Sequence, residues 1–186
     1  MRWWLCASFL LSLAACGDDD GGGTDPGGDA GATVLPSMCD DGPLAEPIAG
    51  CAPALLPSTG DPYEDCFRRI NQFRAECQCL PPLARWEEGE GCADMHAEYD
   101  STRDPHDGFR DRICPEGGNA QNECPGWPSV NATIDGCLQA MWDEGPGEDF
   151  NAHGHYINMS STRYTMVACG FYTTPDGRVW AVQNFR

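Results

Sequence analysis

Cysteine content constrains this chain more than any other feature. The 186 residues contain 12 cysteines; Cys6 and Cys16 lie near the N-terminus, and the other ten run from Cys39 to Cys169. An even set at this density predicts a disulfide framework formed in an oxidising compartment. A zinc-ribbon site is disfavoured, because the C-x-x-C spacing of such sites does not occur and Cys77-Gln78-Cys79 is too tight. We therefore expect five disulfides.

The pairing of these cysteines is open at this stage, because ten cysteines allow roughly 900 connectivities. As working hypotheses we expect Cys114–Cys124 and Cys137–Cys169 among the five bridges. Each bridge in a domain of this size is expected to add about 2–4 kcal/mol to the free energy of unfolding.

The N-terminal stretch "MRWWLCASFLLSLAAC" carries one charge, at Arg2, followed by an apolar run. The run is too short for a bilayer span, which needs about 20 apolar residues, so residues 1–15 are predicted to be a secretory signal peptide. Leu13-Ala14-Ala15-Cys16 resembles the bacterial lipoprotein box, which predicts lipidation of Cys16. The alternative is a plain signal peptide cleaved near Ala15, with Cys16 unmodified.

The stretch that follows, "GDDDGGGTDPGGDAGATVLPS", has almost nothing with which to form a core. Glycine raises the entropic cost of ordering and the aspartates repel one another, so residues 16–60 are predicted to be a flexible tether behind the lipidated cysteine. Calcium binding is disfavoured, because the alternating oxygen ligands and closing glutamate of a calcium loop are missing. We expect an exported protein, lipid-anchored to a bacterial membrane (the outer membrane or the cell surface), with residues 61–186 as its folded domain.

The chain is strongly acidic. Its formal charge is -18, and all 11 basic residues are arginine. From Asp61 onward there are 21 acidic residues and ten arginines, so the expected domain is acidic as well. Nucleic acids and anionic membrane surfaces are bound through basic patches, and we expect neither as a partner of this surface.

Local signals predict helices first and a hairpin last. A helix over residues 62–77 has Asp61 as its cap, Pro62 at the first helical position and Glu64 placed to complete a capping box. The stretches "RYTMVACGFY" and "RVWAVQNF" read as two strands, and the turn "TTPDG" joins them into an antiparallel hairpin. The order of these elements indicates an α+β layer fold.

Two further helices follow from apolar spacing. One runs from about residue 87 to 99, and its inner side is expected to carry Cys92, Met95, His96 and Tyr99. The other starts after the cap Ser129 and carries Ile134, Cys137, Leu138 and Met141 on one stripe. His96 is interpreted as a packing or capping histidine.

Three motifs follow one another in a recognisable order. "INQFRAECQCLPPLARWEE" places Asn71 and Arg74 ahead of Leu83 and Trp86, "GHYINM" is a glycine-histidine-aromatic box, and "VACGFYTTPDGRVWAVQNF" closes the chain. From about Tyr63 onward the chain resembles the CAP superfamily of cysteine-rich secretory, antigen 5 and pathogenesis-related 1 proteins. The resemblance implies a disulfide-rich, three-layer α-β-α sandwich with a broad cleft.

The resemblance also implies a cleft tetrad of two histidines and two acids. His155 lies in the GHY box, and His106 in "DPHDGF" is its expected partner. Imidazole nitrogens from two loops would hold zinc or another divalent metal and leave positions open for water or a ligand. His153 has no counterpart in the pattern; if its stretch is extended, it shares a face with His155. We interpret it as a surface or loop-packing residue.

The chain departs from the pattern at the acids. "AQNECPGWPS" puts Gln121 at the first acidic position, so an amide replaces a carboxylate; an alternative register puts Gly118 there. Glu144 is the candidate second acid and the possible catalytic residue, with Asp143 and Glu148 as alternatives because the spacing from Trp142 is one residue short.

Two classes of function follow. The resemblance favours a non-enzymatic binding module whose cleft accepts a metal, a lipid or sterol, or a protein partner. The alternative is a metal-assisted hydrolase or peptidase in which His106, His155 and Glu144 activate water. Loss of a carboxylate at Gln121 removes one possible general base, which favours the first class.

Overall fold

The computed structural model describes residues 39–186. The signal peptide, the predicted lipidation site Cys16 and the first part of the predicted tether lie outside these residues. Within the described part, no helix combines the length and the apolar character needed to cross a membrane.

One four-stranded sheet forms the middle of the fold, with strand order β1-β3-β4-β2. Strands β3 (Met166–Thr173) and β4 (Val179–Phe185) form the predicted antiparallel hairpin. The short strand β1 (Ala84–Arg85) pairs with β3 in parallel, and β2 (Ala120–Trp127) pairs with β4 in antiparallel orientation. Both β1 and β2 are therefore edge strands.

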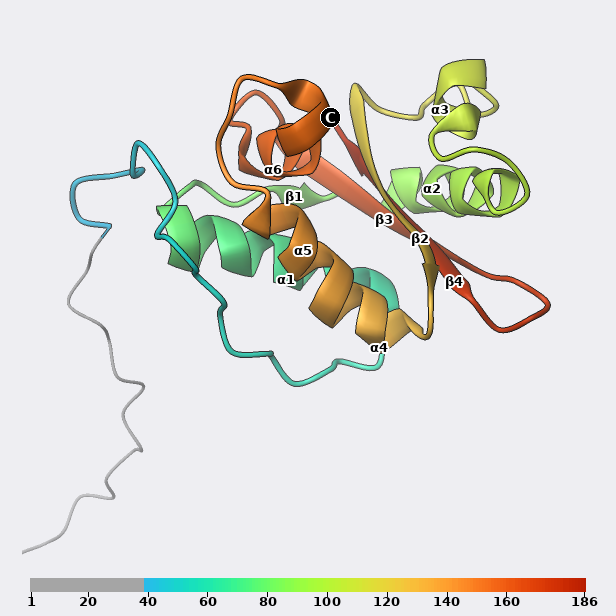
Figure 1. The fold of residues 1–186 in the computed structure, drawn as a ribbon, viewed down its shortest axis with the longest axis horizontal. Helices are drawn as coiled ribbons and strands as arrows, with labels where there is room; N and C mark the ends of the chain where they lie inside the picture. Colours follow the sequence, from blue (N-terminus) through green and yellow to red (C-terminus); the bar gives the residue numbers. More distant parts are fainter. Residues whose placement is uncertain (1–38) are drawn as a thin grey trace, which may run out of the picture. The chain divides into compact units, whose positions relative to one another are not determined.

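Helices cover both faces of this sheet, as Figure 1 shows. On one face lie α1 (Pro62–Gln72) with the π-helical turn η1 (Phe73–Cys77), α4 (Val130–Ala132) with η2 (Thr133–Cys137) and α5 (Leu138–Asp143), and α6 (Phe150–Ser160). On the other face lie α2 (Glu87–Asp100) and the short α3 (Asp107–Asp111). The predicted three-layer α-β-α architecture is confirmed.

The two faces divide by the alternation of the strands. Val167, Cys169 and Phe185 point into the larger core with the helices α1, α5 and α6, whereas Val182 packs against α2. Gly170 lies on the α2 face, where a Cβ atom would come 2.2 Å from the carbonyl carbon of Ala93. A side chain at position 170 would therefore push α2 off the sheet.

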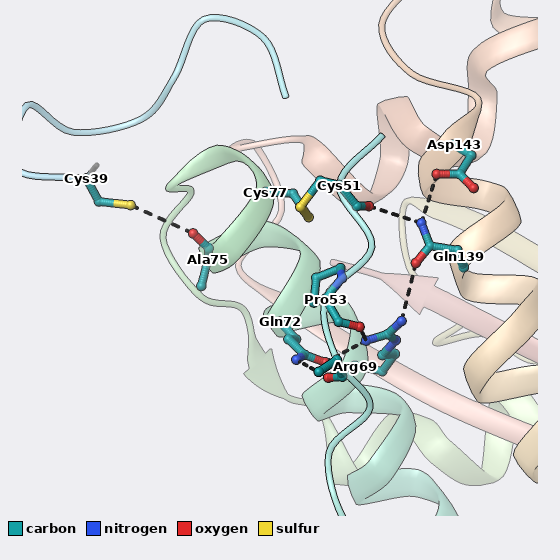
Figure 2. The surroundings of a disulfide bond; sticks show 10 residues. Cys39, Cys51, Pro53, Arg69, Gln72, Ala75, Cys77, Gln139 and Asp143 are labelled. Carbon is teal, nitrogen blue, oxygen red and sulfur yellow. Dashed lines mark hydrogen bonds between the residues drawn. A yellow bond between two sulfur atoms is a disulfide. The ribbon is translucent and has the colours of Figure 1, made fainter. Parts of the chain in front are cut away.

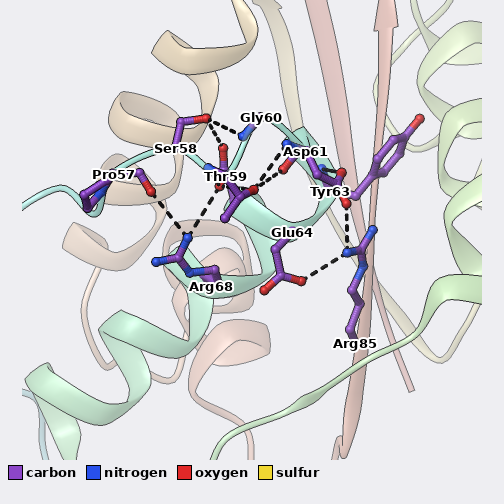
Figure 3. Close-up of polar contacts among 10 residues, drawn as sticks. Pro57, Ser58, Thr59, Gly60, Asp61, Tyr63, Glu64, Arg68 and Arg85 are labelled. Carbon is purple, nitrogen blue, oxygen red and sulfur yellow. Dashed lines mark hydrogen bonds and ion pairs between the residues drawn. The ribbon is translucent and has the colours of Figure 1, made fainter.

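Helix α1 begins where the local signals predict. The Asp61 carboxylate accepts a hydrogen bond from the Tyr63 amide, with Pro62 at the first helical position. The capping box does not close, because Glu64 instead accepts from Arg85, which also binds Asp61 (Figure 3). A tertiary ion pair has replaced the local contact.

Helix α2 has the predicted extent but a different inner face. Met95 is 49% exposed, so its predicted inward position is wrong. The buried stripe consists of Gly89, Cys92, Ala93, His96, Ala97 and Asp100. Ala93 and Ala97 pack on the sheet beside Val182, because α2 lies too close to the strands there for a longer side chain, as the contact at Gly170 shows.

All ten cysteines of the described region form disulfides, which confirms the predicted framework. The bridges are Cys39–Cys79, Cys51–Cys77, Cys66–Cys169, Cys92–Cys114 and Cys124–Cys137. Our expected pairs Cys114–Cys124 and Cys137–Cys169 are wrong. Cys124 and Cys169 both point into the larger core from different strands, where each meets a cysteine of the helix packed above it.

Residues 39–60 form a strap across helices α1 and α5, although we expected them to be flexible tether. Disulfides to Cys77 and Cys79 hold the strap at Cys51 and Cys39. Arg69 donates to the Pro53 carbonyl at 2.9 Å, and Gln139 donates to the Cys51 carbonyl at 3.1 Å (Figure 2). The ordered domain therefore extends at least to residue 39, because these covalent and polar contacts offset the entropic cost of ordering the strap.

Candidate functional site

Strand β2 carries the centre of the candidate site. Gln121 and Glu123 point toward the α2 and α3 face, whereas Asn122 and Cys124 point toward the α5 and α6 face. We assigned no element to this stretch from sequence, because Pro125, Gly126 and the lack of β-branched residues obscure the strand. Its alternation decides which partner each polar side chain meets.

His106 and Gln121, which we predicted as two members of the tetrad, lie in direct contact. Gln121 Oε1 is 2.8 Å from His106 Nδ1. His106 sits in the left-handed region with φ 67°, at the turn between α2 and α3, and its side chain is 36% exposed. The amide nitrogen of Gln121 is directed elsewhere, so the oxygen faces the histidine and His106 donates its Nδ1 hydrogen.

The amide nitrogen of Gln121 is held by two buried acceptors. It lies 3.0 Å from His96 Nδ1 and 3.1 Å from Asn184 Oδ1. His96 is 1% exposed, and burial lowers its pKa, which favours the neutral ring. The position where the family pattern has an acid is therefore a fully hydrogen-bonded amide in this protein.

A buried pair of carboxyl groups, which the sequence motifs do not indicate, lies beside His106. Glu123 Oε2 accepts from the His106 amide at 2.7 Å, and Asp100 Oδ1 accepts from the Gly108 amide at 2.6 Å. Burial, followed by the neighbouring Asp100, raises the pKa of Glu123 to about 8. Burial also raises the pKa of Asp100.

The two remaining oxygens of this pair are Glu123 Oε1 and Asp100 Oδ2. Both are buried, and no hydrogen-bond donor of the described residues contacts them. Two carboxylates in this position are most stable when they share one proton. The pair thus fixes the turn at His106 by accepting hydrogen bonds from the backbone amides of His106 and Gly108. Glu123 lies two residues beyond Gln121, so the period of a strand was the signal that could have revealed it.

His155 and Glu144, the other two predicted members, also lie in contact. Glu144 Oε1 is 2.5 Å from His155 Nδ1, and Glu144 Oε2 accepts from the backbone amides of His155 at 3.0 Å and Tyr156 at 3.4 Å. The side chain of His155 is 35% exposed and that of Glu144 is 24% exposed. Glu144 is thus a carboxylate that orients His155, with its oxygens occupied by three donors.

The stretch around the two neighbouring histidines is helix α6, neither a strand nor a loop. At about 100° per residue, side chains two positions apart diverge, so His153 and His155 do not share a face. His153 Nδ1 lies 2.7 Å from the Glu144 carbonyl and 3.0 Å from the Gly145 carbonyl. These contacts hold His153 against the loop between α5 and α6.

The two halves of the site are joined through adjacent residues of β2. Asn122 Nδ2 donates to the His155 carbonyl at 3.0 Å, and Asn158 Nδ2 donates to Asn122 Oδ1 at 2.9 Å. Helix α6 is therefore bonded to β2 one residue from Gln121. Within residues 39–186, no group of three or more His, Cys, Asp or Glu side chains is arranged to hold a metal ion. A metal bound by two imidazoles would complete its coordination with water or a ligand.

Comparisons with known proteins bear on the fold and the family. The sequence model of the cysteine-rich secretory protein family, CAP, matches residues 67–185. Four chains of solved structures match. One of them, described as "Structure of BmVAL-1", is 17% identical, with a TM-score of 0.48 over 73% of this chain and 80% of that one. No curated protein matches the chain.

Proposed function

Because the chain belongs to the cysteine-rich secretory protein (CAP) family, we propose that it is an exported, membrane-tethered binding module that holds a divalent metal between His106 and His155. One observation, made at both histidine rings, supports the proposal. Each ring has an acceptor at Nδ1, the amide oxygen of Gln121 or the carboxylate of Glu144, which leaves Nε2 with a lone pair.

The donor set fits a metal that prefers imidazole. Zinc and similar divalent ions take neutral histidine nitrogen, and both rings are partly exposed and thus accessible from solvent. When bound, the metal would supply a Lewis-acidic centre with open positions. A lipid, sterol or protein ligand with an oxygen or nitrogen donor would then complete the coordination.

The contacts of the acids favour binding over hydrolysis. Gln121 carries an amide where a carboxylate could have accepted a proton from water. The Glu144 carboxylate already accepts hydrogen bonds from the His155 ring and from two backbone amides. A hydrolase would need a base free to take a proton from water. The proposed role of Glu144 is therefore to orient His155.

Zinc titration calorimetry on the mature chain in its Cys16→Ser form tests the proposal. His106→Ala and His155→Ala should each abolish most binding, because one imidazole with water ligands holds a divalent ion weakly. The matched control, His153→Ala, should bind like the wild type, because helix α6 turns its ring away from that of His155. The Nε2 atom of His153 also packs against Gly147, where a Cβ atom would come 2.3 Å from this nitrogen. Loss of binding in His153→Ala but not in His106→Ala would refute the assignment.

A further inference from the structure

We propose that His96 is a positioning residue for His106, acting through the side-chain amide of Gln121. The part of this inference that concerns metal affinity rests on the proposed function, whereas the part that concerns the proton on His106 does not. The hydrogen-bond partners of His96 Nδ1 are Gln121 and Asn184, so His96 would act on His106 only through Gln121.

The first step is the direction of the Gln121 amide. An amide has one accepting and one donating end, and the surroundings decide which end faces which partner. Gln121 Nε2 has two hydrogens, and two acceptors lie within reach: His96 Nδ1 at 3.0 Å and Asn184 Oδ1 at 3.1 Å. With both hydrogens used there, Oε1 faces His106 Nδ1 at 2.8 Å.

The second step is the tautomer of His96. Two amide nitrogens approach its Nδ1, that of Gln121 at 3.0 Å and that of Asn184 at 3.3 Å. Both are donors, so Nδ1 carries the lone pair and the proton is on Nε2, which faces Cys92 Sγ at 4.0 Å.

The ring of His96 is held in place by close packing. A Cβ atom on Gly117 would come 2.9 Å from Cε1 of the ring, and one on Gly108 would come 3.1 Å from Cδ2. Because the ring is 1% exposed and tightly enclosed, its accepting nitrogen stays directed at Gln121.

The third step is the consequence for His106. If the Gln121 amide were reversed, its nitrogen would face His106 Nδ1, which would then need a lone pair. The proton of His106 would move to Nε2, and that nitrogen could no longer donate to a metal. A carboxylate at position 121 has two equivalent oxygens and would need no such orientation. The amide therefore makes the metal-binding nitrogen of His106 depend on the two acceptors of Gln121 Nε2, of which His96 is one and Asn184 the other.

The test compares His96→Leu, which removes the acceptor, with His96→Asn, whose Oδ1 replaces the accepting nitrogen. The first measurement is the ¹⁵N chemical shifts of the His106 ring in metal-free protein, which distinguish the two tautomers. Wild type and His96→Asn should show the proton on Nδ1, and His96→Leu should show a mixture. The second measurement is zinc titration, where His96→Leu should lose about 10–100-fold in affinity.

The same substitution in a Gln121→Glu background is the decisive control. A carboxylate accepts from His106 with either oxygen, so adding His96→Leu to Gln121→Glu should leave both the tautomer and the zinc affinity unchanged. Gln121→Glu alone should bind zinc at least as tightly as the wild type. If His96→Leu does not fold, Gln121→Met can replace it, because it removes the amide oxygen that accepts from His106 Nδ1. It should give the same tautomer mixture and affinity loss.

The outcomes separate the two proposals. We call the proposed positioning of His106 by His96 through the Gln121 amide the relay. If His106 keeps its proton on Nδ1 in both His96→Leu and Gln121→Met, the relay is wrong whether or not metal binds. If the tautomer shifts as expected but zinc binds to no variant and not to the wild type, the relay stands and the metal site is wrong. An equal affinity loss from His96→Leu with and without Gln121→Glu would overturn the relay in favour of a purely structural effect.

Discussion

Glu123→Gln should stabilise the domain at alkaline pH and have little effect at acid pH. In the wild type Glu123 shares its buried position with Asp100 while accepting from the His106 amide. Glutamine reproduces the protonated acid: its oxygen can accept from His106, and its nitrogen can donate to the Asp100 oxygen that otherwise has no partner. The substitution keeps the hydrogen bonds and removes the ionisation.

The magnitude follows from the pKa of Glu123, which burial raises from 4.5 to about 8. At about 1.36 kcal/mol per pKa unit, this shift corresponds to at most about 5 kcal/mol. Because the folded pKa lies above the unfolded one, the full stability is present below about pH 4.5 and is lost as the pH rises to about 8. The raised pKa of Asp100 acts in the same direction.

The assay is urea unfolding with intact disulfides, at pH values from 4.5 to 8.5. The difference in unfolding free energy between Glu123→Gln and wild type should be near zero at pH 4.5 and reach several kcal/mol at pH 8, a midpoint shift of about 2 M urea. Glu98→Gln, at an exposed position of α2, is the matched control and should show no such trend. A difference that is the same at pH 5 and pH 8 would refute the shared-proton pair.

Three further predictions concern the anchor, the framework and the metal. Cys16→Ser should move the protein from the membrane to the soluble fraction, and an intact mass showing unmodified Cys16 in the wild type would contradict lipidation. Replacing Cys66 and Cys169 together by alanine opens a loop with a sequence separation of 103, which should cost about 4–5 kcal/mol in unfolding free energy, measured by denaturation. Zinc affinity should fall as the solution is acidified, because protonated imidazoles cannot donate to a metal; calorimetry across pH checks this, and a flat profile would exclude histidine ligands.

Features that depend on residues within one or two turns were predictable from the sequence. The cap at Asp61 and the first helical residue Pro62 lie where the sequence indicates, and so does the cap at Ser129. The closing hairpin follows from its alternation and turn. The even number of cysteines likewise predicted five bridges without indicating their partners.

The resemblance of the motifs to the family grouped His106, Gln121, Glu144 and His155 as one candidate site, without indicating which of them are in contact. Gln121 does contact His106, and Glu144 contacts His155. The helical state of the His153 stretch was not anticipated, because its polar residues and central Gly154 show neither an apolar period of 3.6 nor one of 2.

The sequence by itself determined the local elements and the disulfide-rich character, and its family resemblance proposed the candidate site residues. Only the tertiary structure decided which cysteines pair, that Glu64 binds Arg85 instead of closing its cap, and that Glu123 meets Asp100. It also decided the direction of the Gln121 amide, through His96 and Asn184. The physical reason is range: caps and periodicity arise between neighbours in the chain, whereas these partners are brought together only when two layers pack on opposite faces of one sheet.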